Sequence, residues 1–264
     1  MLYAAVAVRA FRRYSTYTTA TLAGIFTNSV FGVIICFSYR AVWTQSPHAG
    51  GYDVRDALTY AWLAQALIMV VGIWGGGATD DVADRIRTGD VAIDLYRPVS
   101  FLGWWLATDL GRAAYHLVTR GVAPTVIGYL LFDLRSPSPL GAALFLVSVL
   151  LAVVVSFGLR MLVATATFWL LDAGGLREVL VMLGLVLSGL SVPLVLFPGW
   201  LHTLVMALPW AAFVQVPVDI WLGHRTGAGV AAGLGFQLGW GVVLLLCCAL
   251  LLRLAERRVV VQGG

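Results

Sequence analysis

The 264-residue sequence contains no lysine, and all seventeen of its basic residues are arginines. The phosphate-binding loop of P-loop ATPases requires a lysine, so the sequence excludes an ATP site of this kind in the chain itself. Charge of either sign is also scarce, because only 11% of the residues are charged, whereas soluble domains have about 25%. Hydrophobic residues make up 60% of the chain. The sequence therefore predicts an integral membrane protein whose use of ATP would need a separate subunit.

Cysteines and catalytic motifs are sparse as well. Cys36, Cys247 and Cys248 fall in apolar stretches and lack the spacing of metal ligands. The motifs H-E-x-x-H and G-x-S-x-G do not occur. We therefore expect no catalytic residue, no metal site and no bound cofactor in this chain. The net charge of +4 comes from arginines beside apolar stretches, which favours contact with membrane lipids carrying anionic headgroups over nucleic acid.

Long apolar stretches are what the sequence has in abundance. A helix needs about 20 mostly apolar residues to cross a bilayer. Six stretches approach or exceed that length, at about 17–39, 57–74, 114–132, 140–170, 179–196 and 230–252. Residues 1–16 carry three arginines among apolar residues, which predicts an amphipathic interfacial helix on the membrane surface. The expected fold is an all-α polytopic membrane protein, a single transmembrane domain over residues 1–264.

The arginines are distributed unequally among the segments that join these stretches. With the N-terminus in the cytoplasm, the cytoplasmic segments hold eleven, namely Arg9, Arg12, Arg13, Arg85, Arg87, Arg97, Arg112, Arg177, Arg253, Arg257 and Arg258. The outer segments hold four, namely Arg40, Arg55, Arg135 and Arg225. Short loops on the cytoplasmic side carry an excess of positive residues. The sequence therefore predicts six spans with both termini in the cytoplasm.

One connecting segment, residues 79–98, carries eight of the chain's thirty charged residues. A charge inside the bilayer costs several kcal/mol, so this segment must lie outside it. Thr79 is suited to cap the start of a helix, and Gly89 to adopt the left-handed conformation after its end. Apolar residues share one helical face, namely Val82, Ile86, Gly89 and Ile93. The pattern predicts a short capped helix followed by an extended stretch, the alternative being a solvated connecting loop.

A second segment, residues 191–223, is too apolar for a free loop and too rich in proline for a spanning helix. Its prolines are Pro193, Pro198, Pro209 and Pro217. The pattern predicts two short helices, at about 199–207 and 209–216, that enter the outer leaflet and return. The alternative, a single kinked additional span, would put the C-terminal arginines outside the cell, against the usual distribution of positive charge.

Three motifs in these segments resemble those of a known family. Leu-Tyr-Arg-Pro covers residues 95–98, Pro-Leu-x-x-Phe-Pro-x-Trp-Leu covers 193–201, and Leu-Pro-Trp with a proline seven positions after the tryptophan covers 208–217. With its length and span pattern, the chain is similar to type-2 ABC exporter permeases, in particular to a bacterial subgroup of uncharacterised or multidrug type. The resemblance implies an inner-membrane protein that pairs with an identical or homologous permease. It also implies two ABC ATPase subunits, which would hold ATP and Mg²⁺.

The resemblance assigns roles to particular residues. Residues 79–98 would be the coupling helix that inserts into the ATPase, through Asp80, Asp81, Asp84, Arg85, Arg87, Asp90, Asp94, Arg97 and Pro98. Residues 197–223 would form an extracellular re-entrant gate, and the implied gate residues are Pro193, Phe197, Pro198, Trp200, Pro209, Trp210 and Pro217. Spans two and five line the central path in such permeases, which points to Trp62, Gln65 and Met69. For Gln65 the alternative is a hydrogen bond to a neighbouring helix.

Charged residues near the third and fourth stretches have simpler expected roles. Asp109 and Arg112 are three residues apart, so we expect an exposed ion pair on a helix surface. Arg160 lies in the long fourth stretch. There we expect it to pair with Asp172, to contact an acidic lipid, or to project beyond the membrane.

The expected function is export of an amphipathic small molecule, drug, lipid-like compound or peptide from the cell, with two alternatives. An ion-coupled secondary transporter would need paired carboxylates inside its spans, and the first, second, fifth and sixth stretches have none. An intramembrane lipid-modifying enzyme of the phosphatidyl-alcohol transferase type would need an Asp-Gly pair and an Ala-Arg pair at fixed spacing. Here the glycine is missing and Asp84 separates Ala83 from Arg85.

Overall fold

The structure is a computed structural model that describes residues 1–74, 77–170 and 172–256. Within these residues the secondary structure is helical and contains no strand, which confirms the all-α prediction. Gly75 and Gly76 lie outside the described residues, as do Arg257 and Arg258 of the orientation argument.

The α-helices of the described chain are α1 (Leu2–Ser15), α2 (Thr18–Gln45), α3 (Val54–Leu67), α4 (Ala78–Thr88), α5 (Val91–Leu95), α6 (Phe101–His116), α7 (Ala123–Leu131), α8 (Pro139–Leu170), α9 (Gly174–Leu187), α10 (Gly199–Ala207), α11 (Gln215–Leu222) and α12 (Ala228–Glu256). A π-helical stretch, Leu117–Val122, joins α6 to α7. Short 3-10 turns cover Ala49–Gly51, Leu194–Leu196 and Pro209–Ala212.

Three helices, α2, α8 and α12, are long and apolar enough to cross a membrane by length and composition. The other predicted spans are built differently. α3 and α9 have 14 residues each, and at 1.5 Å per residue such a helix covers roughly 21 Å of a hydrocarbon core about 30 Å thick. α6, the π-helical stretch and α7 form one continuous helical run. The six-span count therefore stays a prediction.

The helices at two of the predicted spans have bounds that differ from those of the spans. The predicted second span, 57–74, is helical only as far as Leu67, and turns follow it. The helix of the predicted third span, 114–132, already begins at Phe101, because the hydroxyl of Ser100 accepts an N–H of the first turn at 3.1 Å and caps the helix there. The charged residues after this cap, Asp109 and Arg112, thus lie within a packed helix.

α8 is the central helix of the arrangement. α4, α11 and α12 pack against it, α2 packs against α3, and α1 packs across α6. α1 and α6 are in close contact, since a Cβ at Gly111 would lie 2.1 Å from the carbonyl oxygen of Ala7. The largest core cluster joins side chains of α3, α8 and α11, such as Leu67, Val153 and Val216. α2, α9 and α12 expose apolar side chains, as helices that face lipid do.

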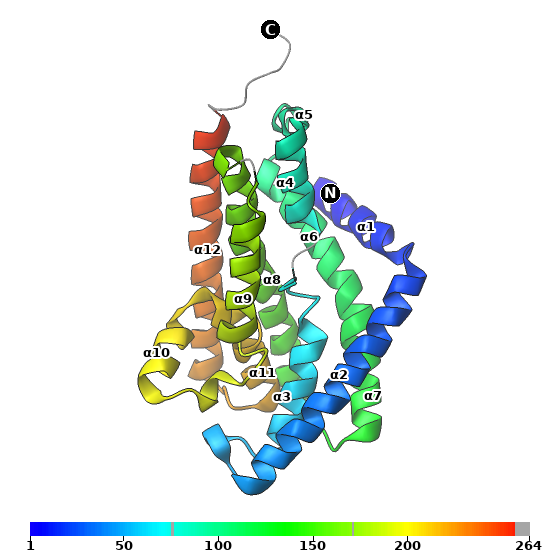
Figure 1. Cartoon of the computed structure of the whole chain (residues 1–264), viewed down its shortest axis with the longest axis vertical. Coiled ribbons are helices and arrows are strands. Elements are labelled where there is room, and N and C mark those ends of the chain that lie inside the picture. The colour runs from blue at the N-terminus through cyan, green and yellow to red at the C-terminus, as the bar shows by residue number, and fades with distance from the viewer. Residues whose placement is uncertain (75–76, 171, 257–264) are drawn as a thin grey trace.

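The molecule has two distinct ends (Figure 1). α5, the start of α1 and the last turns of α12 lie at one end, which we name the terminal end. α10 and the loop before α3 lie at the opposite end, which we name the loop end. α1 occupies the predicted N-terminal helix, and its placement on a membrane surface stays a prediction.

Candidate coupling site and the ion cluster beneath it

α4 forms the first half of the charged segment at the terminal end. It begins at Ala78, after Gly77 in a left-handed backbone conformation (φ 92°). Thr79 is therefore not the N-cap that the sequence predicts. It is buried in the first turn, where its hydroxyl accepts a hydrogen bond from Arg160 at 3.4 Å. The predicted role of Gly89 is confirmed, because it ends α4 with φ 82°.

The extended stretch is predicted over residues 94–99, and this is wrong at its start, since α5 includes Asp94 and Leu95. Arg85 explains the difference. Its guanidinium donates to the carboxylate of Asp94 at 3.2 Å and to the carbonyl of Asp90 at 3.1 Å, and these bonds turn α5 back towards α4. Arg97 lies 3.1 Å from the same buried Asp94 carboxylate. Four of the predicted coupling residues, Arg85, Asp90, Asp94 and Arg97, therefore brace the segment from within.

The outer face of the segment combines an exposed ion pair with exposed apolar side chains. Asp84 and Arg87 pair at 2.5 Å, and both side chains are more than half exposed. Ile93 is 59% exposed and Tyr96 80% exposed. The apolar face of α4 continues into Val91 and not into Ile93 as predicted, because α5 changes the direction of the chain. Apolar side chains exposed among charged ones are typical of a surface that binds protein.

Two arginines from other helices hold α4 in place. Arg13 of α1 donates to Asp81 at 2.7 Å, and Arg177 of α9 donates to Asp80 at 3.3 Å. The hydrogen bond that Arg13 donates to the Asp81 carboxylate is the main reason that the pKa of Arg13 is raised, so this guanidinium stays charged. α4 is thereby connected to both α1 and α9.

Beneath α4 lies an ion cluster, which consists of Asp109 and Arg112 of α6 and Arg160 of α8. All three side chains are more than nine-tenths buried. The Asp109 carboxylate is 2.7 Å from Arg112 Nε and 2.6 Å from Arg160 Nη2. The predicted exposed pair of Asp109 and Arg112 is therefore wrong, because α6 begins early and carries both residues between α4 and α8. The predicted partners of Arg160, Asp172 or lipid, are wrong for the same reason.

The ion cluster also holds the end of α3, where the helix stops and turns begin. Arg112 donates to the carbonyls of Met69 at 2.6 Å and Val70 at 3.1 Å, and Ser156 donates to the carbonyl of Val71. Carbonyls that lose their helical partners must be satisfied in another way when they are buried. The cluster thus connects the end of α3 and the first turn of α4 to α6 and α8.

The sequence offers one signal for this cluster. Arg160 is the only charged residue in the 32-residue helix α8. A lone charge in so apolar a stretch requires a buried partner or a polar cavity. The partner itself cannot be identified from spacing, since Asp109 lies 51 positions earlier in the chain.

The three predicted path residues have different surroundings. Trp62 is fully buried and donates to the carbonyl of Pro124 at 2.8 Å. Gln65 is half-buried, and its backbone carbonyl accepts a hydrogen bond from the Asn28 side chain at 3.3 Å. Met69 is half-buried beside the ion cluster. Their role in a substrate path stays a prediction.

At the loop end, the first predicted short helix matches α10 from Gly199 to Ala207. The second is displaced, because Pro209 starts a 3-10 turn and α11 follows only at Gln215. Pro217 then falls in the first turn of α11, where a missing N–H costs little. The predicted gate residues divide into three groups: Pro193, Pro209 and Pro217 are buried, Phe197 and Trp210 are half-buried, and Pro198 and Trp200 are exposed.

Buried polar side chains join α11 to the start of α3. The Gln215 amide nitrogen donates to the Tyr52 hydroxyl and to the Asp219 carboxylate, both at 2.8 Å. The Gln215 carbonyl oxygen accepts from the Leu194 N–H at 2.8 Å and from the Tyr60 hydroxyl at 3.0 Å. Burial raises the pKa of Tyr52, so its hydroxyl stays protonated. The sequence singles out none of these side chains.

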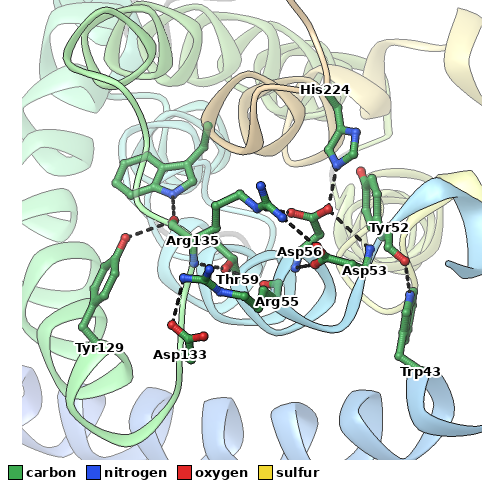
Figure 2. Close-up of polar contacts among 11 residues, drawn as sticks. Trp43, Tyr52, Asp53, Arg55, Asp56, Thr59, Tyr129, Asp133, Arg135 and His224 are labelled. Atoms are coloured by element: carbon green, nitrogen blue, oxygen red, sulfur yellow. Dashed lines mark hydrogen bonds and ion pairs between the residues drawn. The ribbon is translucent and has the colours of Figure 1, made fainter. Parts of the chain in front are cut away.

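A second set of polar side chains connects the loops next to this network (Figure 2). Arg135 lies 2.7 Å from Asp53 and 2.5 Å from Asp56, and His224 lies 3.0 Å from Asp56. Figure 2 shows Arg135 extending across the start of α3 towards both carboxylates. The loops before α3, before α8 and after α11 are thereby tied together.

The fold and these two ends define an all-helical membrane protein with an exposed, braced segment at one end and a closed polar network at the other. The chain belongs to the ABC-2 family of transporter proteins, whose family model matches residues 29–263. No curated protein matches the chain. The family consists of transport permease subunits, and membership implies association with ABC ATPase subunits. Among the described residues no group of His, Cys, Asp and Glu could hold a metal ion.

Proposed function

We propose that this chain is the membrane subunit of an ATP-driven exporter and that α4 and α5 receive the movement of its ATPase subunits. The observation that carries the proposal is the exposure of Ile93 and Tyr96 on a braced, charged segment at the terminal end (Figure 1). Internal bonds of Arg85 and Asp94 keep this segment stiff. A stiff segment with an apolar tip is suited to transmit force from a partner.

The ion cluster gives that movement a route into the membrane helices. Thr79 of α4 contacts Arg160, which binds Asp109 of α6, while Arg112 holds the end of α3. Closure of two ATPase subunits on ATP and Mg²⁺ would displace α4, and α3, α6 and α8 would move with it. Alternating access by movement of packed helices as rigid bodies is an established form of transport.

The assembly would contain two permeases, identical or homologous, each with six spans and both termini in the cytoplasm of a bacterial inner membrane. The terminal end supports this orientation, because α4 and the last turns of α12 bring Arg85, Arg87 and Arg253 to it. α10 and α11 would form the extracellular gate. The cargo would be an amphipathic molecule moved outwards.

Ion-coupled transport has weaker support. Asp109 is a carboxylate buried among the membrane helices, but two guanidinium groups bind it. A carboxylate in that position is held in its charged form and is unsuited to take up and release a proton.

The test uses the chain co-expressed with its ATPase and reconstituted in liposomes. Replacing the exposed tip in the variant Ile93→Ser/Tyr96→Ser should abolish co-purification of the ATPase and lower ATP-dependent efflux at least tenfold, as loss of a central apolar contact does. Thermal unfolding of the permease should stay unchanged, since both side chains are exposed.

A matched pair of charge reversals sharpens this test. D84R/R87D reverses the exposed pair on α4, and R55D/D133R reverses an exposed pair at the loop end with a similar distance of 2.8 Å. Only the first should slow ATP-dependent efflux. Normal efflux by the tip variant, or equal loss in both reversals, contradicts the coupling role. Arg85 is unsuited to this test, because its replacement would also remove the hydrogen bonds that hold α5 against α4.

A further inference from the structure

Arg120, in the π-helical stretch between α6 and α7, is bound differently from the arginines of the ion cluster. Within the described parts of the chain it forms no ion pair, and its Nη2 donates a hydrogen bond to the backbone carbonyl of Ala20 in α2 at 3.3 Å. A guanidinium has five N–H donors in a planar fork. Most of the donors of Arg120 are therefore available to a group outside the chain.

The guanidinium of Arg120 lies against the backbone of α2. A Cβ at Gly24 would overlap the guanidinium carbon, so this contact requires a residue without a side chain. The hydrogen bond to Ala20, one turn earlier in α2, holds the group on the same side of that helix. Arg120 is half-buried. The chain thus fixes the guanidinium in place and leaves it reachable from outside.

The length of α2 places this contact at a boundary of the hydrocarbon core. α2 is long and apolar enough to cross a membrane. From Gly24 to its last residue, Gln45, it rises by roughly 32 Å, which matches a hydrocarbon core about 30 Å thick. With Gln45 at one boundary of the core, Gly24 lies at the other. Arg120 is then at the level where lipid phosphates begin.

A lipid-facing track on α2 continues from this level towards the middle of the bilayer. Thr27, Phe31 and Ile34 follow Ala20 at spacings of seven, four and three residues, so they share its face of the helix. All are exposed, Phe31 and Ile34 to 53% each. From Gly24 to Ile34 the helix rises by roughly 15 Å, half the thickness of the core. The track therefore has the length of one leaflet.

Negative charge is missing from the helices around Arg120. α1, α2, the π-helical stretch and α7, all within the described residues, contain no Asp or Glu. Two carboxylates reach α1 and α6 and are already bound, Asp81 by Arg13 and Asp109 within the ion cluster. Arg12, in the last turn of α1, is exposed and adds positive charge. A charge at the edge of the bilayer core is costly without a partner, so Arg120 favours an anion from outside the chain.

A lipid phosphate suits this position better than a soluble anion does. The fork of an arginine binds two oxygens of a phosphate through parallel N–H donors. A soluble anion would have no part that covers the exposed side chains of Phe31 and Ile34. A phospholipid has both parts, a phosphate and an acyl chain that continues into the core.

We infer that Arg120, seated on Gly24, binds the phosphate of an anionic phospholipid whose acyl chain lies along Thr27, Phe31 and Ile34. The lipid belongs to the leaflet nearer the terminal end, on the side where α1 joins α2 (Figure 1). It would connect α2 to the π-helical stretch, beside the contact that Gly24 permits. The inference requires neither an ATPase nor export.

The test uses the purified full chain in detergent, freed of lipid, and native mass spectrometry. The probes are dioleoyl phosphatidylglycerol, which is anionic, and dioleoyl phosphatidylcholine, whose net charge is zero. R120Q should bind phosphatidylglycerol about tenfold more weakly than the wild type, as loss of hydrogen bonds to a charged group predicts. The control is R40Q, which removes an exposed arginine near the other end of α2 and should leave this affinity unchanged.

G24A is a second variant, because its methyl group displaces the guanidinium without removing the charge. It should weaken binding of phosphatidylglycerol as R120Q does, and it replaces R120Q if that variant does not fold. Equal affinity of R120Q and R40Q for phosphatidylglycerol overturns the inference, and so does equal affinity of the wild type for the two lipids.

Glycerol 3-phosphate, which has the phosphate without acyl chains, distinguishes the two sources of a phosphate. It should not displace phosphatidylglycerol from the wild type. Displacement at equal concentration would assign the site to a soluble anion and overturn the lipid. Because no ATPase is present, the result stands apart from the success or failure of the proposed export.

Discussion

The two ends of the molecule are held together in different ways. At the loop end, Gln215, Tyr52 and Asp219 are buried and bind one another inside the chain. At the terminal end, α4 is attached to α1 and α9 by ion pairs that water reaches, and α5 exposes apolar side chains. Elements with few buried contacts open at lower free energy than those in a core. The loop end is thus held by buried bonds between uncharged and charged side chains, and the terminal end by ion pairs exposed to water.

The largest expected effect concerns the ion cluster, which lies between these ends. Asp109→Leu leaves two guanidinium groups buried without their carboxylate. It should lower the free energy of unfolding by about 3–5 kcal/mol, measured as a fall in the thermal midpoint of the detergent-solubilised protein.

Arg160→Met is the matched variant for that experiment. It leaves Asp109 paired with Arg112, one charge against one, and should cost about 1–3 kcal/mol. A smaller loss for Asp109→Leu than for Arg160→Met would show that the excess positive charge is not buried as the structure has it.

The next largest effect concerns the buried polar network at the loop end. Gln215→Leu removes the partner of the Leu194 N–H and of two tyrosine hydroxyls, so it should cost about 2–3 kcal/mol through unpaired buried groups. Gln45→Leu, at the exposed end of α2, is the control and should change the thermal midpoint little. Equal midpoints for both variants would mean that the network does not stabilise the loop end.

The smallest effect concerns the attachment of α4. Asp81→Asn removes the exposed ion pair with Arg13 and should cost below about 1 kcal/mol, less still at high salt. The same thermal-unfolding experiment at low and high ionic strength measures it. A loss as large as that of Gln215→Leu would remove the distinction between the two ends.

Local patterns in the sequence predict part of this structure well. The glycine that ends α4 and the bounds of α10 follow from conformational rules that depend on neighbours in the chain. The boundary of α6 was missed because the apolar period of residues 114–132 hides the cap at Ser100. The ion cluster and the Gln215 network were missed because their members lie far apart in the sequence, so only packing brings them together.

The π-helical stretch between α6 and α7 has a consequence for how the two ends communicate. A π turn inserts an extra residue and interrupts the regular ladder of backbone hydrogen bonds, a common cause of kinks in helices. The half of this helical run that carries Asp109 and the half that reaches the loop end are therefore separated by an interruption of that ladder. Helix axes can change direction at such an interruption, so the tilt of α7 need not follow that of α6.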